Sequence, residues 1–78
     1  MSITFNPDEI FEMAEQIERN GAAFYREAAA KAKDAPTRKT FNDLAAMEDG
    51  HLMIFQGMRK ELSVAALLSR MRSEASAA

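Results

Sequence analysis

Three residues of this sequence carry side chains that commonly bind metal ions, and their spacing allows them to meet. Glu48 and His51 stand three positions apart, so on a helix both point to the same side. Glu18 stands earlier in the chain, in a segment with similar apolar spacing. Iron, manganese and zinc accept carboxylate and imidazole ligands together. The three residues therefore predict a metal site, if the fold brings the two segments to the same level.

Both segments have the spacing of amphipathic helices, and the candidate ligands lie in the middle of the apolar faces. Residues at intervals of three and four in the second segment form one such face: Phe41, Leu44, Glu48, His51, Phe55, Met58 and Leu62. In the first segment the matching face and the row that widens it are Phe11, Ala14, Glu18, Gly21, Tyr25 and Ala28, with Ile10, Ile17 and Phe24. An unpaired carboxylate on a buried face costs several kcal/mol, and a bound cation would remove that cost.

The segment NPDE predicts the start of the first helix. Asn6 can cap it, Pro7 suits its first position, and Glu9 stands where an acid completes a capping box. We expect this helix over residues 7–32. The composition favours helices over strands, because alanine and methionine are common whereas valine and isoleucine are few.

The segment KDAPTR predicts a break between two helices. Pro36 disfavours a helical conformation at the residue before it, and Asp34 or Thr37 can cap a second helix. We expect this second helix over residues 36–62. Two long helices joined by so short a connection form an antiparallel hairpin.

The last part of the chain predicts a further, short helix. Ser63 can cap it, and we expect it over residues 64–73, followed by a frayed tail over residues 74–78. The predicted fold is therefore all-α. It is an antiparallel two-helix hairpin with a short C-terminal helix, forming one domain over residues 1–78.

The hairpin predicts that the candidate ligands lie at one depth. Glu18 stands as many residues before the break as His51 stands after it. Both helices rise about 1.5 Å per residue, so Glu18 should be level with His51, and Glu48 should lie one turn away. All three side chains should therefore converge on the inner side of the hairpin.

The number of ligands predicts a homodimer. One hairpin supplies two carboxylates and one imidazole and leaves an apolar face uncovered. Two hairpins related by a two-fold axis would form a four-helix bundle with four carboxylates and two imidazoles. Di-metal bundles use this set, with a Glu on two helices and a Glu-x-x-His pair on the other two. The two Glu48 carboxylates would bridge the metals, and each Glu18 and His51 would be terminal.

Composition argues against several function classes. The chain has 78 residues and no cysteine, so it carries neither a disulfide framework nor an iron–sulfur centre. Its net charge is -2 and its charges are interspersed, which gives no basic stripe for nucleic acid. No apolar run is long enough to span a membrane, and the first residues lack signal-peptide features. We therefore expect a cytoplasmic protein.

The two helical segments resemble the rubrerythrin-like branch of the ferritin-like superfamily over residues 8–62. The resemblance is carried by IERNGAAFYREAA and FNDLAAMEDGHLMIF, in which the matching positions are Glu18, Tyr25, Phe41, Leu44, Ala45, Glu48 and His51. Rubrerythrin-like proteins have two such halves in one chain, whereas this sequence has one. In that respect it resembles the encapsulated ferritins, which build a di-iron site between two subunits.

The resemblance implies a ferroxidase-type enzyme. Glu18, Glu48 and His51 of two chains would hold two iron ions, with manganese or zinc as other candidates. Tyr25 would donate a hydrogen bond to a ligating carboxylate. The protein would oxidise Fe(II) in iron storage or detoxification, and it would act as a higher-order homo-oligomer. A further possibility is that it is cargo inside an encapsulin shell. The tail SEASAA does not resemble the targeting peptide of such cargo.

Two other functions fit the same residues. A rubrerythrin-like peroxide reductase would use the same site but would need an external electron donor, because these 78 residues include no cysteine-rich rubredoxin domain. A non-catalytic helical dimerisation module would keep the metal as a structural element. Glu15, one turn before Glu18, is expected to be exposed, with a role as an entry-site carboxylate as the alternative.

Overall fold

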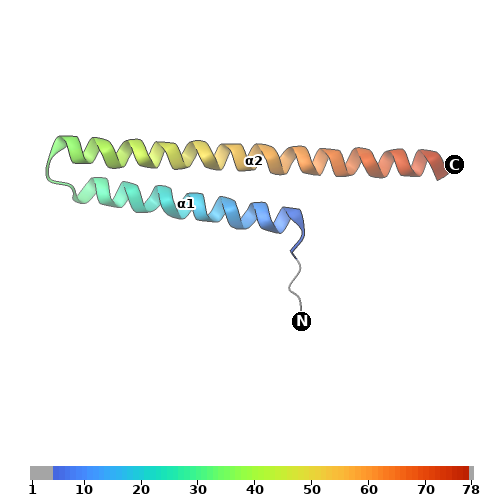
Figure 1. Cartoon of the computed structure of the whole chain (residues 1–78), viewed down its shortest axis with the longest axis horizontal. Helices are drawn as coiled ribbons and strands as arrows, with labels where there is room; N and C mark the ends of the chain where they lie inside the picture. Colours follow the sequence, from blue (N-terminus) through green and yellow to red (C-terminus); the bar gives the residue numbers. More distant parts are fainter. Residues whose placement is uncertain (1–4, 78) are drawn as a thin grey trace.

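The chain folds as a helical hairpin, in which two long helices run antiparallel beside each other (Figure 1). The structure is a computed structural model that describes residues 5–77. Helix α1 spans Pro7–Lys31 and helix α2 spans Ala35–Ala77. The predicted all-α class and the hairpin are confirmed. The Cα atoms extend over 67 × 31 × 11 Å, so the molecule is a single layer of helices.

Helix α1 begins where the NPDE segment predicts. The Asn6 side-chain oxygen accepts a hydrogen bond of 2.8 Å from the backbone N–H of Glu9, and Pro7 occupies the first turn. Asp8 and Glu9 add negative charge at the positive end of the helix dipole. The helix ends at Lys31, and the backbone N–H of the next residue still donates to the carbonyls of the last turn.

The connection between the helices is short because Asp34 starts α2 at once. The Asp34 carboxylate accepts a hydrogen bond of 2.9 Å from the backbone N–H of Thr37, as an N-cap does. Helix α2 begins at Ala35, one residue earlier than Pro36 suggests. The Arg38 guanidinium donates to the carbonyl of Ala32 at 3.0 Å, which ties the start of α2 to the end of α1.

The prediction of a separate third helix over residues 64–73 is wrong, because α2 continues through Ser63 to Ala77. Residues 58–77 contain neither glycine nor proline, so nothing in them breaks the helix. The Ser63 hydroxyl donates to the carbonyl of Arg59, one turn earlier, at 3.1 Å instead of capping a new helix. The expected frayed tail is likewise helical up to Ala77, and Ala78 lies outside the described residues.

Small residues line the contact between the helices. The buried apolar side chains are those of Ala22, Ala29 and Ala45, none of which is more than 4% exposed. Alanines at this seam let the two helix backbones approach closely. Aromatic pairs pack on either side of the ligand level, one formed by Phe11 and Phe55 and the other by Tyr25 and Phe41, each with ring centroids 6.4 Å apart.

One broad side of the hairpin is apolar and uncovered in the single chain. We call it the open face, and helical spacing places six exposed apolar residues on it: Ile10, Ile17 and Phe24 of α1, and Met47, Ile54 and Met58 of α2. Ile17, for example, keeps 67% of its surface exposed. The opposite side is largely polar, with Met53 exposed on it, and it carries the ion pair between Arg26 and Asp49.

Neither helix, over the residues that the structure describes, combines the length and the apolar character that crossing a membrane requires.

Candidate metal centre

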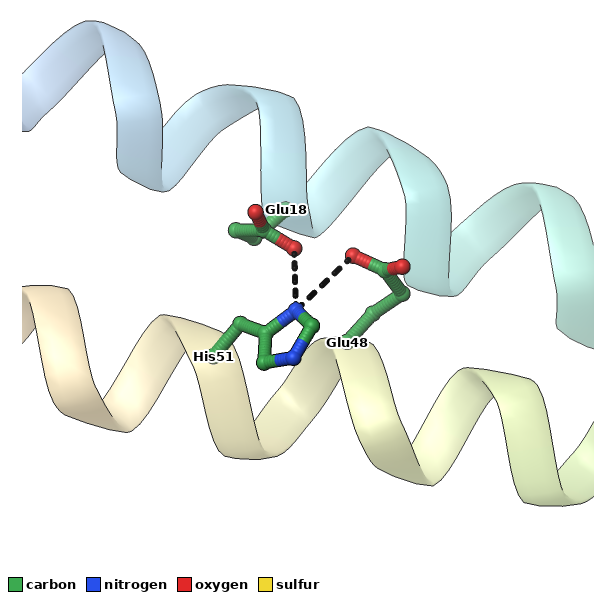
Figure 2. Close-up of side chains that lie close together, drawn as sticks. All are labelled: Glu18, Glu48 and His51. Carbon is green, nitrogen blue, oxygen red and sulfur yellow. Dashed lines mark ion pairs between the residues drawn. The ribbon is translucent and has the colours of Figure 1, made fainter.

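Glu18, Glu48 and His51 converge between the two helices, at the edge of the open face. Glu18 comes from α1, and Glu48 and His51 come from adjacent turns of α2 (Figure 2). The His51 Nδ1 atom lies 3.4 Å from Glu18 Oε2 and 3.8 Å from Glu48 Oε2. One ligand atom from each residue lies within 4.8 Å of the others. The structure thus brings together the three predicted residues; that they bind a metal stays a prediction.

A buried oxygen of Glu18 indicates what this cluster lacks. Glu18 Oε2 is buried and accepts no hydrogen bond from the described part of the chain. An unsatisfied buried carboxylate oxygen is unfavourable unless a cation or a proton compensates it. The side chains are 15% exposed for Glu18, 23% for Glu48 and 48% for His51, so the imidazole is the group nearest to solvent. A divalent cation between the two acids and the imidazole fits this donor set.

The two carboxylates affect each other's charge. The Glu18 carboxyl, close enough to share a proton, raises the pKa of Glu48 above its ordinary value, and partial burial raises it further. The nearby His51 opposes this effect. Two acids held this close resist being ionised together, and a metal ion would relieve that repulsion more fully than a shared proton.

The Arg26–Asp49 ion pair joins the helices beside the cluster, on the polar side of the hairpin. The Arg26 guanidinium donates to both carboxylate oxygens of Asp49, the residue directly after Glu48. This hydrogen bonding lowers the pKa of Asp49. The pair spans the two helices at the same register that levels Glu18 with His51.

Arg59 joins the helices a second time, about two turns after His51. Its guanidinium contacts Asp8 Oδ1 at 2.6 Å, and both Glu15 oxygens at 3.4 Å. The hydrogen bond from Arg59 lowers the pKa of Asp8. The expectation that Glu15 is exposed is wrong, because only 3% of its surface reaches solvent. Arg59 and Arg19 compensate its charge, so a metal is not needed there.

Residue spacing contained a signal for this second polar contact. Glu15 stands one heptad before Ala22 and two before Ala29, so it belongs to the buried seam of α1. Arg59 stands two heptads after the buried Ala45 of α2. A carboxylate on one seam and a guanidinium on the other, little more than one turn apart in depth, predict an ion pair between them, because the arginine side chain is long enough to span that offset.

Tyr25 lies away from the cluster within one chain. Its ring stacks on Phe41 with an interplanar angle of 23° and forms an edge-to-face contact with Phe24. Over residues 5–77, no hydrogen bond joins the Tyr25 hydroxyl to Glu18 or Glu48. The structure therefore gives Tyr25 a packing role towards the connection, and the predicted hydrogen bond to a ligand stays a prediction.

Comparison with known proteins identifies the family. No curated protein and no solved structure matches the chain significantly. The family model described as Rubrerythrin matches residues 9–77, which is most of the chain and includes all three residues of the cluster. The match also covers the part of α2 that extends past α1, beyond the residues that carry the resemblance in sequence. The chain belongs to the Rubrerythrin family.

Proposed function

We propose that two copies of this chain form a four-helix bundle and oxidise Fe(II) at a site built from Glu18, Glu48 and His51 of both copies. Membership of the Rubrerythrin family indicates a di-iron, ferritin-like protein. The observation that supports the site is the cluster itself, with a buried Glu18 oxygen that has no hydrogen-bond donor among residues 5–77. Iron is the substrate in this proposal.

The exposed area of the single chain supports pairing. The chain exposes 6282 Å², whereas a compact monomer of 8.7 kDa exposes about 4,700 Å². The excess of roughly 1,500 Å² exceeds the approximately 800 Å² that each partner contributes to a standard interface. Much apolar surface lies on the open face, beside the exposed side of His51. Pairing through this face would therefore cover the apolar side chains and enclose the cluster in one step.

Pairing also completes the ligand set. One cluster offers three ligating residues, too few for two metal ions with several protein ligands each. A two-fold axis through the open face doubles the set to four carboxylates and two imidazoles, the number that di-metal bundles use. In this arrangement each Glu48 would be shared between the two ions, and each Glu18 and His51 would hold one ion. The alternative metals, manganese and zinc, accept the same ligands.

The protein residues promote oxidation by charge and geometry. Two Fe(II) ions would each give one electron to the oxidant and become Fe(III). Dioxygen would take both electrons with two protons and leave as hydrogen peroxide, whereas hydrogen peroxide would take them with two protons and leave as two water molecules. Anionic carboxylates stabilise the higher charge of the product more than that of the substrate, so they lower the reduction potential of the bound iron. The ion pairs of Arg26 and Arg59 join α1 and α2 at the register that places Glu18 opposite His51.

Iron oxidation in solution tests this function. Anaerobic protein loaded with Fe(II) is mixed with air, and the near-ultraviolet absorbance of Fe(III) is followed against buffer. The wild type should oxidise iron faster than buffer, and Glu18→Gln and His51→Ala should fall to the buffer rate. Asp43→Asn is the matched control, because this exposed acid of α2 forms its ion pair with Lys39, away from the cluster. No acceleration by an intact wild-type dimer would overturn the proposal.

The oxidant separates ferroxidase from peroxide reductase activity. Both activities would use the same cluster, but a peroxide reductase consumes hydrogen peroxide catalytically only when an electron donor returns the iron to Fe(II). The expected result is that dioxygen oxidises the bound Fe(II) at least as fast as hydrogen peroxide does, and that adding an electron donor brings no sustained peroxide turnover. Sustained peroxide turnover with the donor present would identify a peroxide reductase. Equal metal content with no oxidation by either oxidant would instead identify a dimerisation module with a structural metal.

Storage of the oxidised iron requires a larger assembly than this dimer. Two flat hairpins enclose no chamber for a mineral, so the product must leave or enter a compartment formed by further copies or by a shell. An encapsulin shell is one such partner, and its only support is the resemblance to encapsulated ferritins. The part of α2 beyond α1 offers a surface for further copies, because Val64, Leu67 and Leu68 are exposed there.

A further inference from the structure

Gly21 borders the carboxylate of Glu48 across the helix seam. It is half-buried in the middle of α1, one turn after Glu18. A Cβ atom placed on Gly21 would lie 3.4 Å from both Cδ and Oε2 of Glu48, and 3.5 Å from its Cγ. These are ordinary van der Waals contacts. A methyl group at position 21 would therefore fit, and it would touch the ligand carboxylate directly.

Backbone conformation does not require a glycine at this position. No glycine among the described residues has a positive φ angle, and Gly21 lies within a regular helix. Glycine in a helix interior is destabilising relative to alanine, so its presence has a cost without a backbone reason. The nearest atoms to the added Cβ all belong to the Glu48 side chain. The space left by the glycine is thus space beside this carboxylate.

Metal binding requires a small movement of Glu48. The His51 Nδ1 atom lies 3.4 Å from Glu18 Oε2 but 3.8 Å from Glu48 Oε2, whereas two ligand atoms at roughly 2 Å from one tetrahedral ion lie about 3.3 Å apart. The Glu48 carboxylate must therefore turn for its oxygen to reach an ion held by the other two residues. Glu48 has the more flexible of the two α2 side chains in the cluster, and its Oε2 atom lies 3.8 Å from His51 Nδ1 and 3.4 Å from the position of a Cβ atom on Gly21.

We propose that Gly21 is a positioning residue, whose missing side chain leaves the room in which the Glu48 carboxylate turns as metal binds. This inference rests on the proposed function, since it needs metal binding at Glu18, Glu48 and His51. A methyl group in that room would hold the carboxylate in its metal-free position and shield Oε2. The fold would tolerate the methyl group, and metal affinity would suffer.

Gly57 provides a matched control for this inference. It also lies inside a helix, and a Cβ atom placed on it would meet nothing within 4 Å. Gly21→Ala and Gly57→Ala therefore remove the same conformational freedom from the unfolded chain, but only the first touches Glu48. In the presence of a chelator, both variants should melt at a higher temperature than the wild type and keep its subunit number in native mass spectrometry.

Cobalt(II) titration, followed by visible absorbance without air, measures the affinity. We expect Gly21→Ala to bind Co²⁺ about tenfold or more weakly than the wild type, and Gly57→Ala to bind within about twofold of it. Equal binding by both variants would overturn the inference. Loss of assembly in Gly21→Ala would also overturn it, because it would assign the glycine to helix or subunit packing.

A double-mutant cycle with Glu48→Asp identifies the partner of the methyl group. Aspartate is one methylene shorter and withdraws the carboxylate from position 21. The loss of Co²⁺ affinity caused by Gly21→Ala should therefore be several-fold smaller in the Glu48→Asp background. The same loss in both backgrounds would contradict a contact with Glu48. If the wild type binds no Co²⁺, that result overturns the proposed function, and the inference about Gly21 falls with it.

Discussion

Glu18 and Glu48 lie beside each other with no arginine or lysine paired to them among the residues that the structure describes. The nearby arginines are engaged with other acids, Arg26 with Asp49 and Arg59 with Asp8 and Glu15. His51 is the only basic group with ion pairs to Glu18 and Glu48 among residues 5–77. The polar groups around the cluster are thus mutually satisfied, whereas the cluster itself is not. This contrast is the physical basis for expecting a cation there.

Replacing Glu48 with glutamine should stabilise the metal-free protein at neutral pH. The neighbouring Glu18 carboxyl raises the pKa of Glu48 in the folded chain above its ordinary 4.5. The favourable contribution of the protonated acid is therefore fully present below 4.5 and is lost as the pH rises through the raised value. Glu48→Gln is always neutral, so it removes this loss. The expected result, with a chelator, is a melting temperature a few degrees above that of the wild type at neutral pH.

The pH dependence of the melting temperature distinguishes this effect of the Glu48 charge from a stabilisation that is the same at every pH. The difference between Glu48→Gln and the wild type should shrink as the pH falls through the raised pKa and vanish below the ordinary value of 4.5. Other acids, such as Asp8 and Asp49 with their lowered pKa values, cancel in this difference. Glu61→Gln, at an exposed position of α2, serves as the control and should show no such trend. A Glu48→Gln protein less stable than the wild type at neutral pH would contradict the account.

At the scale of the helices, the seam of alanines sets how closely α1 and α2 approach. Ala45 is 1% exposed and faces α1, so a larger side chain there has no free volume to fill. Ala45→Leu should lower the free energy of unfolding by about 1–3 kcal/mol through overpacking. Chemical denaturation measures the change.

The neighbouring residue provides the control for this prediction. Ala46→Leu places the same side chain at an exposed position of the same helix and should stay within about 0.5 kcal/mol of the wild type. Because overpacking separates the helices, Ala45→Leu should also weaken Co²⁺ binding. Unchanged stability of Ala45→Leu would mean that the seam is less tightly packed than the structure shows.

The sequence predicts the elements better than it predicts their polar contacts. Asn6 and Asp34 have side chains that cap nearby N–H groups, so both helix starts follow from local sequence, and the matching depth of Glu18 and His51 follows from counting residues. Ser63 misleads because a serine hydroxyl can cap a new helix or donate to a carbonyl one turn earlier in the same helix. The absence of glycine and proline after Gly57 is what favours the second arrangement. Glu15 misleads because its burial depends on an arginine from the other helix.

At the scale of the whole molecule, α2 is much longer than its partner helix. Its C-terminal part extends past the start of α1 (Figure 1), and it exposes Val64, Leu67, Leu68 and Met71 at helical spacing. Helical spacing places this stripe on a different side of α2 from the open face. The proposed dimer leaves the stripe uncovered, so it is available to a contact between dimers.

Truncation after Ser63 should therefore separate the two levels of assembly. The full chain is expected to form an even-numbered oligomer larger than a dimer, and the truncated chain is expected to stop at the dimer. Native mass spectrometry gives both masses. Co²⁺ binding should be retained, because the cluster and the contacts of Arg59 lie before the cut. A truncated chain that keeps the full oligomer mass would show that the stripe makes no contact between dimers.

The alanine seam also bears on how long two partners stay together. A hairpin whose buried apolar residues are Ala22, Ala29 and Ala45 gains little from folding by itself, so most of the apolar burial in the proposed dimer comes from its partner. Separation of the two chains then amounts to unfolding of each. When two differently tagged forms of the chain are mixed, mixed dimers should form no faster than the bundle unfolds. Bound metal slows unfolding, so it should slow the exchange of partners by the same factor.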